Sequence, residues 1–219
     1  MYPLSEEEMR TVVSALAQKL DSLNIDYAVM GGAASYLLSP AANRTTNDID
    51  LVIHVDQRMI TADSLTTVLL ESYPAEFEGA SQFGHTIPAY KLAQPTGGVR
   101  LVELEVFDHR SWPQRPQYNI PAATRTRMNI NGQVVKLFSA GWILREKILS
   151  QYQRQGTRKE GADIGDLIRM IPLAQKGIPE LDFNGNAEMQ TALANLLQKR
   201  PELAQPLKAK IKCDTAFQN

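Results

Sequence analysis

The chain has 219 residues, of which 43 % are hydrophobic and 21 % are charged, and its formal net charge is −1. This length allows one hydrophobic core with a helical appendage, and the composition excludes a largely disordered chain. The near-zero net charge argues against a protein that coats nucleic acid, because such proteins need a large excess of Lys and Arg.

Cysteine content and hydropathy exclude further classes. The single cysteine, Cys213, cannot form an intrachain disulfide or a Cys-rich zinc site. The N-terminal segment is acidic and lacks the pattern of a signal peptide. No run of about 18 apolar residues is present. We therefore expect no membrane span and a cytoplasmic location.

Hydrophobic periodicity predicts the secondary structure of the first part of the chain. Ser5 and Glu8 form a capping-box pattern at the start of the first helix, and Asn131-Gly132 is a hairpin signal. The predicted elements, in chain order, are a helix at 5–23, a strand at 26–30, a helix at 33–38, a strand at 49–55, a helix at 62–72, a hairpin within 79–98 that includes a weak strand near 86–92, a strand at 99–107, a loop at 110–128 and a strand at 134–138.

From Ser139 onward the pattern becomes helical. Helices are predicted at 140–153, 163–171, 187–199 and 201–211. The change of pattern predicts a strand-rich core over residues 1–138 and a helical C-terminal region over residues 139–219.

The first chemically informative feature is Gly31-Gly32, which follows a buried strand and precedes a short helix. Because glycine has no Cβ, the backbone can approach a ligand closely. The helix that follows directs free N–H groups and the positive end of its dipole outward, which favours phosphate binding. Ser35, in the first turn, can add a hydroxyl group.

The second feature is the pair Asp48 and Asp50 at the start of the next strand. Residues two apart on a strand lie on one face, so both carboxylates point the same way, about 6–7 Å apart. Hard oxygen ligands suit Mg²⁺, which binds one or two carboxylates together with substrate phosphates. Two carboxylates without a cation would repel each other, so the pattern favours a metal site.

Each feature also has a simpler structural explanation. Gly31-Gly32 can be only a tight turn, and an Asp-x-Asp pair can cap a strand or lie on a solvated edge. Arg44 can simply pair with Asp48. The order and spacing of the features together favour the functional interpretation.

These residues together resemble the signature of the DNA polymerase β-like nucleotidyltransferases. The longer pattern is similar to the abortive-infection toxin-type (AbiEii-like) subgroup, and the match is tight over residues 26–53. The residues that carry it are Gly31-Gly32 and Arg44-x-Thr46-x-Asp48-Ile49-Asp50. The resemblance implies that Gly31 and Gly32 bind a triphosphate. It also implies that Asp48 and Asp50 ligate Mg²⁺ (or Mn²⁺).

The family supplies a third carboxylate from a later central strand, and here Glu103 and Glu105 are the candidates. Both lie on one face of the strand at 99–107. The apolar residues around Glu105 favour it as catalytic residue and metal ligand, and Glu103 remains the alternative. This carboxylate can also accept the proton of an acceptor hydroxyl. The structural alternative is a solvated sheet face.

The resemblance extends into the helical region. Lys147, followed by the segment 158–167, is similar to a Lys-bearing helix and an acidic helix of the same relatives, in which the Lys lies near the nucleotide phosphates. It implies a nucleotide-binding role for Lys147, next to Arg44, Thr46 and Ser35. A solvated helix face is the structural alternative.

The resemblance implies an α+β nucleotidyltransferase fold, with a small twisted mixed sheet flanked by helices and followed by the helical region. The predicted function is Mg²⁺-dependent transfer of a nucleoside monophosphate from a nucleoside triphosphate such as ATP. The acceptor, an RNA end, a protein or a small molecule, stays open. One alternative is a catalytically inactive nucleotide-binding or interaction module, favoured if neither Glu103 nor Glu105 faces Asp48 and Asp50. Another is a toxin regulated by a partner.

Overall fold

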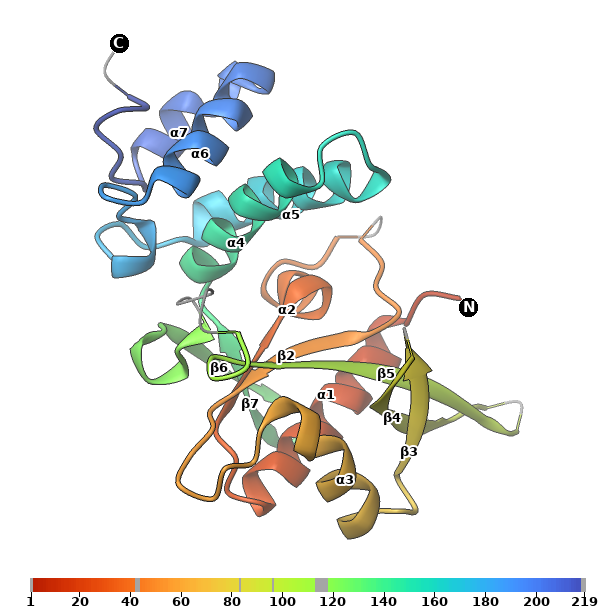
Figure 1. The fold of residues 1–219 in the computed structure, drawn as a ribbon. Helices are drawn as coiled ribbons and strands as arrows, with labels where there is room; N and C mark the ends of the chain where they lie inside the picture. The colour runs from red at the N-terminus through yellow and green to blue at the C-terminus, as the bar shows by residue number, and fades with distance from the viewer. Residues whose placement is uncertain (1, 42–43, 83, 96, 113–117, 218–219) are drawn as a thin grey trace.

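The computed structural model describes residues 2–41, 44–82, 84–95, 97–112 and 118–217. Within them, seven strands form a sheet in the order β3-β4-β5-β2-β1-β7-β6 (Figure 1). The strands are β1 (Tyr27–Met30), β2 (Ile49–Ile53), β3 (Phe77–Gln82), β4 (His85–Ala93), β5 (Val99–Asp108), β6 (Arg125–Ile130) and β7 (Gln133–Phe138). The α-helices are α1 (Glu6–Ser22), α2 (Gly31–Leu38), α3 (Ala62–Ser72), α4 (Ala140–Gln153), α5 (Arg158–Leu173), α6 (Ala187–Lys199) and α7 (Ala204–Lys208).

The sheet is mixed. At its centre β2 runs parallel to β5 and antiparallel to β1, and β1 runs parallel to β7. The outer strands pair as antiparallel hairpins, β3 with β4, β4 with β5, and β6 with β7. The parallel pairing of β2 and β5 sets Asp50 beside Glu105. This sheet confirms the predicted α+β fold with a mixed sheet flanked by helices.

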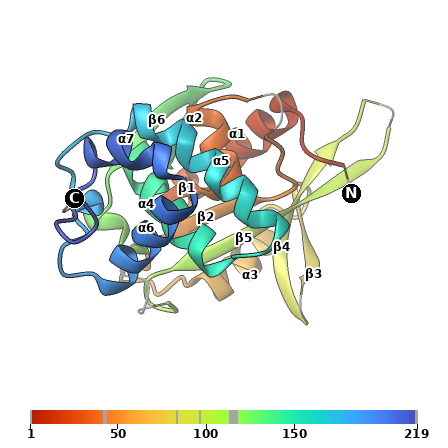
Figure 2. The same cartoon turned by 90° about the horizontal axis from the view of Figure 1, so that it is seen from above.

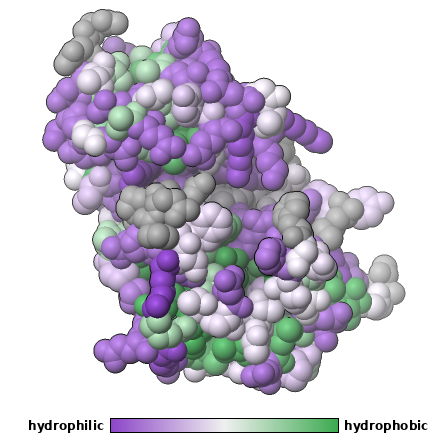
Figure 3. Space-filling model, viewed as in Figure 1, coloured by the Kyte–Doolittle hydropathy of each residue, from purple (hydrophilic) through white to green (hydrophobic). Residues whose placement is uncertain are grey.

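Helices cover both faces of the sheet. α1 and α3 lie on one face, while α2 lies on the other, beneath α4 and α5 (Figure 1). α4 and α5 lie over α2, while α6 packs against α4 and, with α7, lies farther from the sheet (Figure 1 and Figure 2). In the space-filling view, the part formed by the C-terminal helices exposes mostly hydrophilic residues (Figure 3). The C-terminal helices therefore cover the face of the sheet on which α2 lies.

The hydrophobic core continues from the sheet into the C-terminal helices. One cluster of buried apolar side chains includes Leu51 of β2, Trp142 of α4 and Leu193 of α6. The side chain of Ser139 caps α4 by accepting a hydrogen bond from the N–H of Trp142. The boundary that we propose between residues 138 and 139 therefore falls at a helix cap, inside a continuous core.

Two strands were not predicted from the sequence. β3 buries only Phe77 and has polar or small residues elsewhere, so it lacks a clear alternating pattern. β6 is a polar edge strand that begins inside the predicted loop at 110–128 and extends past its end, and residues 113–117 of that loop lie outside the described residues. Edge strands bury little surface, which explains why hydrophobicity alone did not predict them.

Other predicted boundaries also differ from the structure. α2 begins at Gly31, two residues before its predicted start. α5 begins at Arg158, five residues before its own predicted start. The predicted helix at 201–211 is a 3₁₀ turn, Pro201–Leu203, followed by the short α7. The capping box of α1 is confirmed, since Ser5 and Glu8 bond reciprocally. In the described part of the chain, no helix combines the length and apolar character needed to cross a membrane.

Candidate active site

The N-terminus of α2 lacks a side-chain cap. The helix begins at Gly31, in the left-handed region with φ +64°, and its N-cap Met30 offers no side-chain hydrogen bond. By contrast, α1, α3, α4 and α6 are capped by Ser5, Thr61, Ser139 and Asn186. Because the first N–H groups of a helix have no intrahelical partner, this end suits an external anion.

The two glycines also allow the loop before β2 to pack against the start of α2. A Cβ atom at Gly31 would overlap the Asp50 carboxylate, lying 2.7 Å from its Cγ atom. A Cβ atom at Gly32 would lie 2.7 Å from Oγ1 of Thr46. The absence of a Cβ atom at Gly31 therefore lets the carboxylate of Asp50 lie directly against the helix N-terminus, and its absence at Gly32 leaves room for Thr46.

The predicted acidic residues gather at one place on the sheet. Asp50 pairs in register with Glu105 across β2 and β5. Glu103 precedes Leu104, the partner of Ile49, and so lies level with Asp48. The hydroxyl of Thr46 donates a 2.8 Å hydrogen bond to Oδ1 of Asp48 and so orients this carboxylate.

Negative charge is crowded around Asp50. Burial, together with the negative charges of Asp48 and Glu105, raises the pKa of Asp50 from its ordinary value of 3.8 to about 7. A hydrogen bond with Glu105 also favours the protonated form, while the nearby Lys147 lowers the pKa. A cation bound at this position would stabilise the ionised carboxylate of Asp50.

The donor set suits magnesium only with help from a substrate. In the described ranges, no three His, Cys, Asp or Glu side chains form a group that by itself would hold a metal ion. Mg²⁺ commonly takes one or two carboxylates and completes its shell with water and substrate phosphates. Asp48 and Asp50 fit this mode. Glu105 accepts a 2.9 Å hydrogen bond from the Nε2 atom of Gln82.

A group of basic residues, the cationic cluster, lies where α2, α4 and α5 meet. Nε of Arg44 lies 2.8 Å from the carboxylate of Asp166, and Nζ of Lys147 lies 2.7 Å from Asp163 and 2.9 Å from Asp166. Both aspartates are buried. The cluster consists of Arg44, Lys147, Arg154 and Arg169 around Asp163 and Asp166. Four cationic groups thus face two carboxylates, which leaves an excess of positive charge.

Three of the predicted nucleotide-binding residues, Arg44, Ser35 and Lys147, have partners within the protein in this structure. Arg44 pairs with Asp166 rather than with Asp48. Ser35 is buried, and its hydroxyl donates to the carbonyl of Gly31 at 2.9 Å, so it does not face a ligand at this position. Lys147 is also buried, although it lies close enough to Asp50 to influence the pKa of that residue.

Two features of the site were not predicted. Gln82, which contacts Glu105, comes from β3, a strand that hydrophobicity did not indicate. Phe107 lies on the same face of β5 as Glu103 and Glu105, as strand alternation would have indicated. Its ring centroid lies 6.2 Å from that of Trp112 and 5.6 Å from that of Tyr118, so an aromatic cluster begins two residues after Glu105.

Comparison with known proteins identifies the family. The chain is 72 % identical to an antigenic nucleotidyltransferase-like protein from Paracoccidioides brasiliensis, whose crystal structure superposes with a TM-score of 0.96 over 100 % of both chains. The chain belongs to the nucleotidyltransferase-like family. No protein-family model and no curated protein matches the sequence.

More distant structural neighbours of this nucleotidyltransferase-like chain include two antibiotic-modifying proteins. The antibiotic-resistance factor ANT(2'')-Ia is 14 % identical and has a TM-score of 0.48, over 92 % of this chain and 97 % of the other. The lincosamide antibiotic adenylyltransferase LnuA is 12 % identical and has a TM-score of 0.39, over 77 % and 99 %. The AbiEii-like subgroup is not tested by these comparisons and stays a prediction.

Replacing Asp50 by Asn should stabilise the protein when no divalent cation is present. The raised pKa means that ionising Asp50 destabilises the fold, by little at pH 4 and increasingly up to about pH 7. In EDTA at pH 8, we expect Asp50→Asn to raise the melting temperature by several degrees, at about 2–4 °C per kcal/mol for a chain of this size. The gain should shrink at pH 5.

The control for this prediction is Asp56→Asn. The hydrogen bonds and charge of Arg58 lower the pKa of Asp56, so this substitution should give no gain in melting temperature. A melting temperature of Asp50→Asn below that of the wild type at pH 8 would contradict the electrostatic crowding described above.

Alanine at Gly31 should destabilise the fold more than alanine at another left-handed glycine. Gly132→Ala introduces only backbone strain of about 1–2 kcal/mol, because no atom lies within 4 Å of its Cβ position. Gly31→Ala adds the overlap with Asp50, and overpacking of this kind costs about 1–3 kcal/mol more. Urea unfolding measures the loss in free energy of unfolding for each variant. Equal losses would exclude the close approach of Asp50 to Gly31.

Proposed function

We propose that the protein is a Mg²⁺-dependent nucleotidyltransferase that moves a nucleoside monophosphate from a nucleoside triphosphate to an acceptor. The observation that carries the proposal is the position of Asp50, beside Glu105 in the sheet and against the uncapped N-terminus of α2 at Gly31. A metal-binding group and a phosphate-binding group thus lie next to each other. Membership in the nucleotidyltransferase-like family supports the same reaction.

The residues of the chain have complementary roles in binding the triphosphate. The first-turn N–H groups of α2, at Gly31 and Gly32, donate to phosphate oxygens. The excess positive charge of the cationic cluster stabilises the negative charge that develops on the departing pyrophosphate. Arg44 is the member nearest to Gly32, and Lys147 is the member that acts on Asp50. Thr46 orients Asp48.

The carboxylates have two roles. Asp48 and Asp50, with Glu105, would hold Mg²⁺ (or Mn²⁺), which when bound polarises the phosphate and acidifies the acceptor hydroxyl. A carboxylate oxygen of Glu105 accepts the proton of that hydroxyl. The acceptor oxygen then forms a bond to the α-phosphorus, the bond from this phosphorus to the bridging oxygen breaks, and pyrophosphate leaves. Gln82 holds Glu105 in place through its 2.9 Å hydrogen bond.

The two alternatives differ in their support. The inactive-module alternative is favoured when no glutamate of β5 faces Asp50, whereas Glu105 pairs with Asp50 and raises its pKa. A partner-regulated toxin would be favoured by an exposed apolar patch in the C-terminal helices. Among the large apolar residues in the described part of the C-terminal helices, Ile168 and Leu173 are exposed. The acceptor, whether an RNA end, a protein or a small molecule, is the open part of the proposal.

Glutamine substitutions distinguish the two candidate carboxylates. Glu105→Gln should lower kcat for transfer by about 10²-fold or more with little change in KM, because it removes a group that accepts a proton during the reaction. Glu103→Gln should lower kcat less than tenfold. The assay follows label from α-³²P-labelled nucleoside triphosphates into RNA, protein and aminoglycoside acceptors, with and without Mg²⁺.

A larger loss for Glu103→Gln than for Glu105→Gln would move the third-carboxylate role to Glu103. The absence of label transfer from all four nucleoside triphosphates to every acceptor class would count against the proposed reaction.

A further inference from the structure

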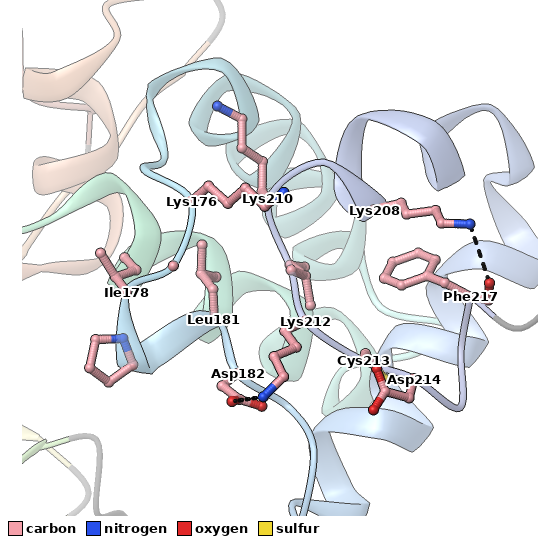
Figure 4. A pocket seen from close by; sticks show the side chains of 13 residues that line it. Lys176, Ile178, Leu181, Asp182, Lys208, Lys210, Lys212, Cys213, Asp214 and Phe217 are labelled. Carbon is pink, nitrogen blue, oxygen red and sulfur yellow. Dashed lines mark hydrogen bonds and ion pairs between the residues drawn. The ribbon is translucent and has the colours of Figure 1, made fainter.

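A cavity lies among the C-terminal segments, away from the candidate active site. It has a volume of about 780 Å³ and is formed by the connection after α5 and the chain that follows α7 (Figure 4). The lining includes neither Asp48, Asp50 nor Glu105. The volume is within the range of about 300–1,000 Å³ typical of small-molecule sites.

Hydrogen bonds join the two segments that form this cavity, residues 181–184 and 212–214. Asp182 and Lys212 form a parallel bridge, flanked by hydrogen bonds of 2.9 Å from the N–H of Lys212 to Leu181 and 2.8 Å from the N–H of Phe183 to Lys212. Further along, Asn184 and Asp214 exchange two hydrogen bonds of 2.9 Å. The cavity therefore does not depend on an unsupported tail.

The lining is apolar inside and basic at the rim. Leu181 and Ile211 are almost fully buried, and the ring of Phe217 lies beside Lys208 in the close view (Figure 4). The side chains that supply the charges are Lys176, Lys208, Lys210, Lys212, Asp182 and Asp214. Four ammonium groups and two carboxylates leave a positive excess.

The lysines differ in how they are engaged. Lys212 is paired with Asp182 at 2.9 Å, whereas no carboxylate of the described residues lies within ion-pair distance of Lys176, Lys208 or Lys210. Among the described residues, Lys208 and Lys210 donate hydrogen bonds only to backbone carbonyls, those of Phe217 and Ala174. Backbone carbonyls leave the positive charge uncompensated, so these ammonium groups remain available to an anion.

We propose that this cavity binds an organic monoanion with an apolar body, such as a medium-chain carboxylate. The apolar body would lie on Ile178, Pro179 and Phe217, whose side chains are accessible above the buried Leu181 and Ile211, and the carboxylate would lie at the lysine rim. A polyphosphate fits less well, because Asp182 and Asp214 at the same rim would repel several negative charges. The inference concerns a site separate from the proposed active site, so neither depends on the other.

The test is a titration of the full chain with decanoate, followed by methyl NMR of labelled isoleucines. Ile178 and Ile211 line the cavity, while Ile53 is buried in β2 and serves as the reference for an intact fold. We expect decanoate to shift the methyl signals of Ile178 and Ile211 with saturation and to leave Ile53 unchanged. Decanol and decyltrimethylammonium, which share the chain but lack the negative charge, should bind at least about tenfold more weakly.

Charge reversal at the rim provides the matched comparison. Lys176→Glu/Lys208→Glu should weaken decanoate binding by about tenfold or more. Arg158→Glu/Lys159→Glu changes the net charge equally at exposed positions at the start of α5, outside the cavity lining, and should leave the affinity within about twofold. Unchanged Ile53 signals in each variant would show that the fold is retained.

Each remaining outcome would overturn the proposal. If decanoate leaves Ile178 and Ile211 unshifted, the cavity is not a site for this class of ligand. If decanol binds as tightly as decanoate, or if both pairs of substitutions weaken decanoate equally, the lysine rim does not select an anion.

Discussion

Carboxylates held close together at the centre of the sheet are the constraint on which the rest of the site depends. The parallel pairing of β2 with β5 sets Asp50 beside Glu105, and Asp48 adds a third negative charge. Such a group destabilises the fold unless a proton or a cation compensates it. The cost is characteristic of a functional site, where an arrangement that is unfavourable for the empty protein favours a ligand.

The surrounding elements place opposite charge around these carboxylates. Gly31 brings the positive end of α2 directly to Asp50, because no Cβ atom intervenes. The C-terminal helices contribute Lys147 together with the buried Asp163 and Asp166, and Asp166 in turn holds Arg44 from the loop that leads into β2. The helical region therefore completes the site electrostatically as well as extending the core. The ion pairs of Lys147 with Asp163 and Asp166 are buried, so loss of one partner would leave an uncompensated buried charge.

Local sequence patterns predicted the parts of the fold that bury apolar residues. The periodicity of α4 and the capping box at Ser5 have local causes, so they could be predicted. β3 and β6 are edge strands stabilised by pairing rather than by burial, so their sequences carry little signal.

For the site, the Gly-Gly and Asp-x-Asp patterns indicated which side chains gather, because strand alternation fixes their face. Arg44 and its partner Asp166 are 122 residues apart, and Lys147 meets its partners only because α4 packs against α5, so the tertiary fold brings these groups together. The burial of Ser35 beneath the first turn of α2 likewise depends on packing that no local pattern records.

Calorimetric titration with each of the four nucleoside triphosphates, with and without Mg²⁺, tests the central claim most directly. The comparison is between the wild type and Asp48→Asn/Asp50→Asn. The account predicts saturable binding of at least one triphosphate that requires Mg²⁺ and is lost in the double variant, while circular dichroism shows both proteins folded. Binding that is independent of Mg²⁺ and unchanged in the double variant, or no binding of any triphosphate, would contradict it.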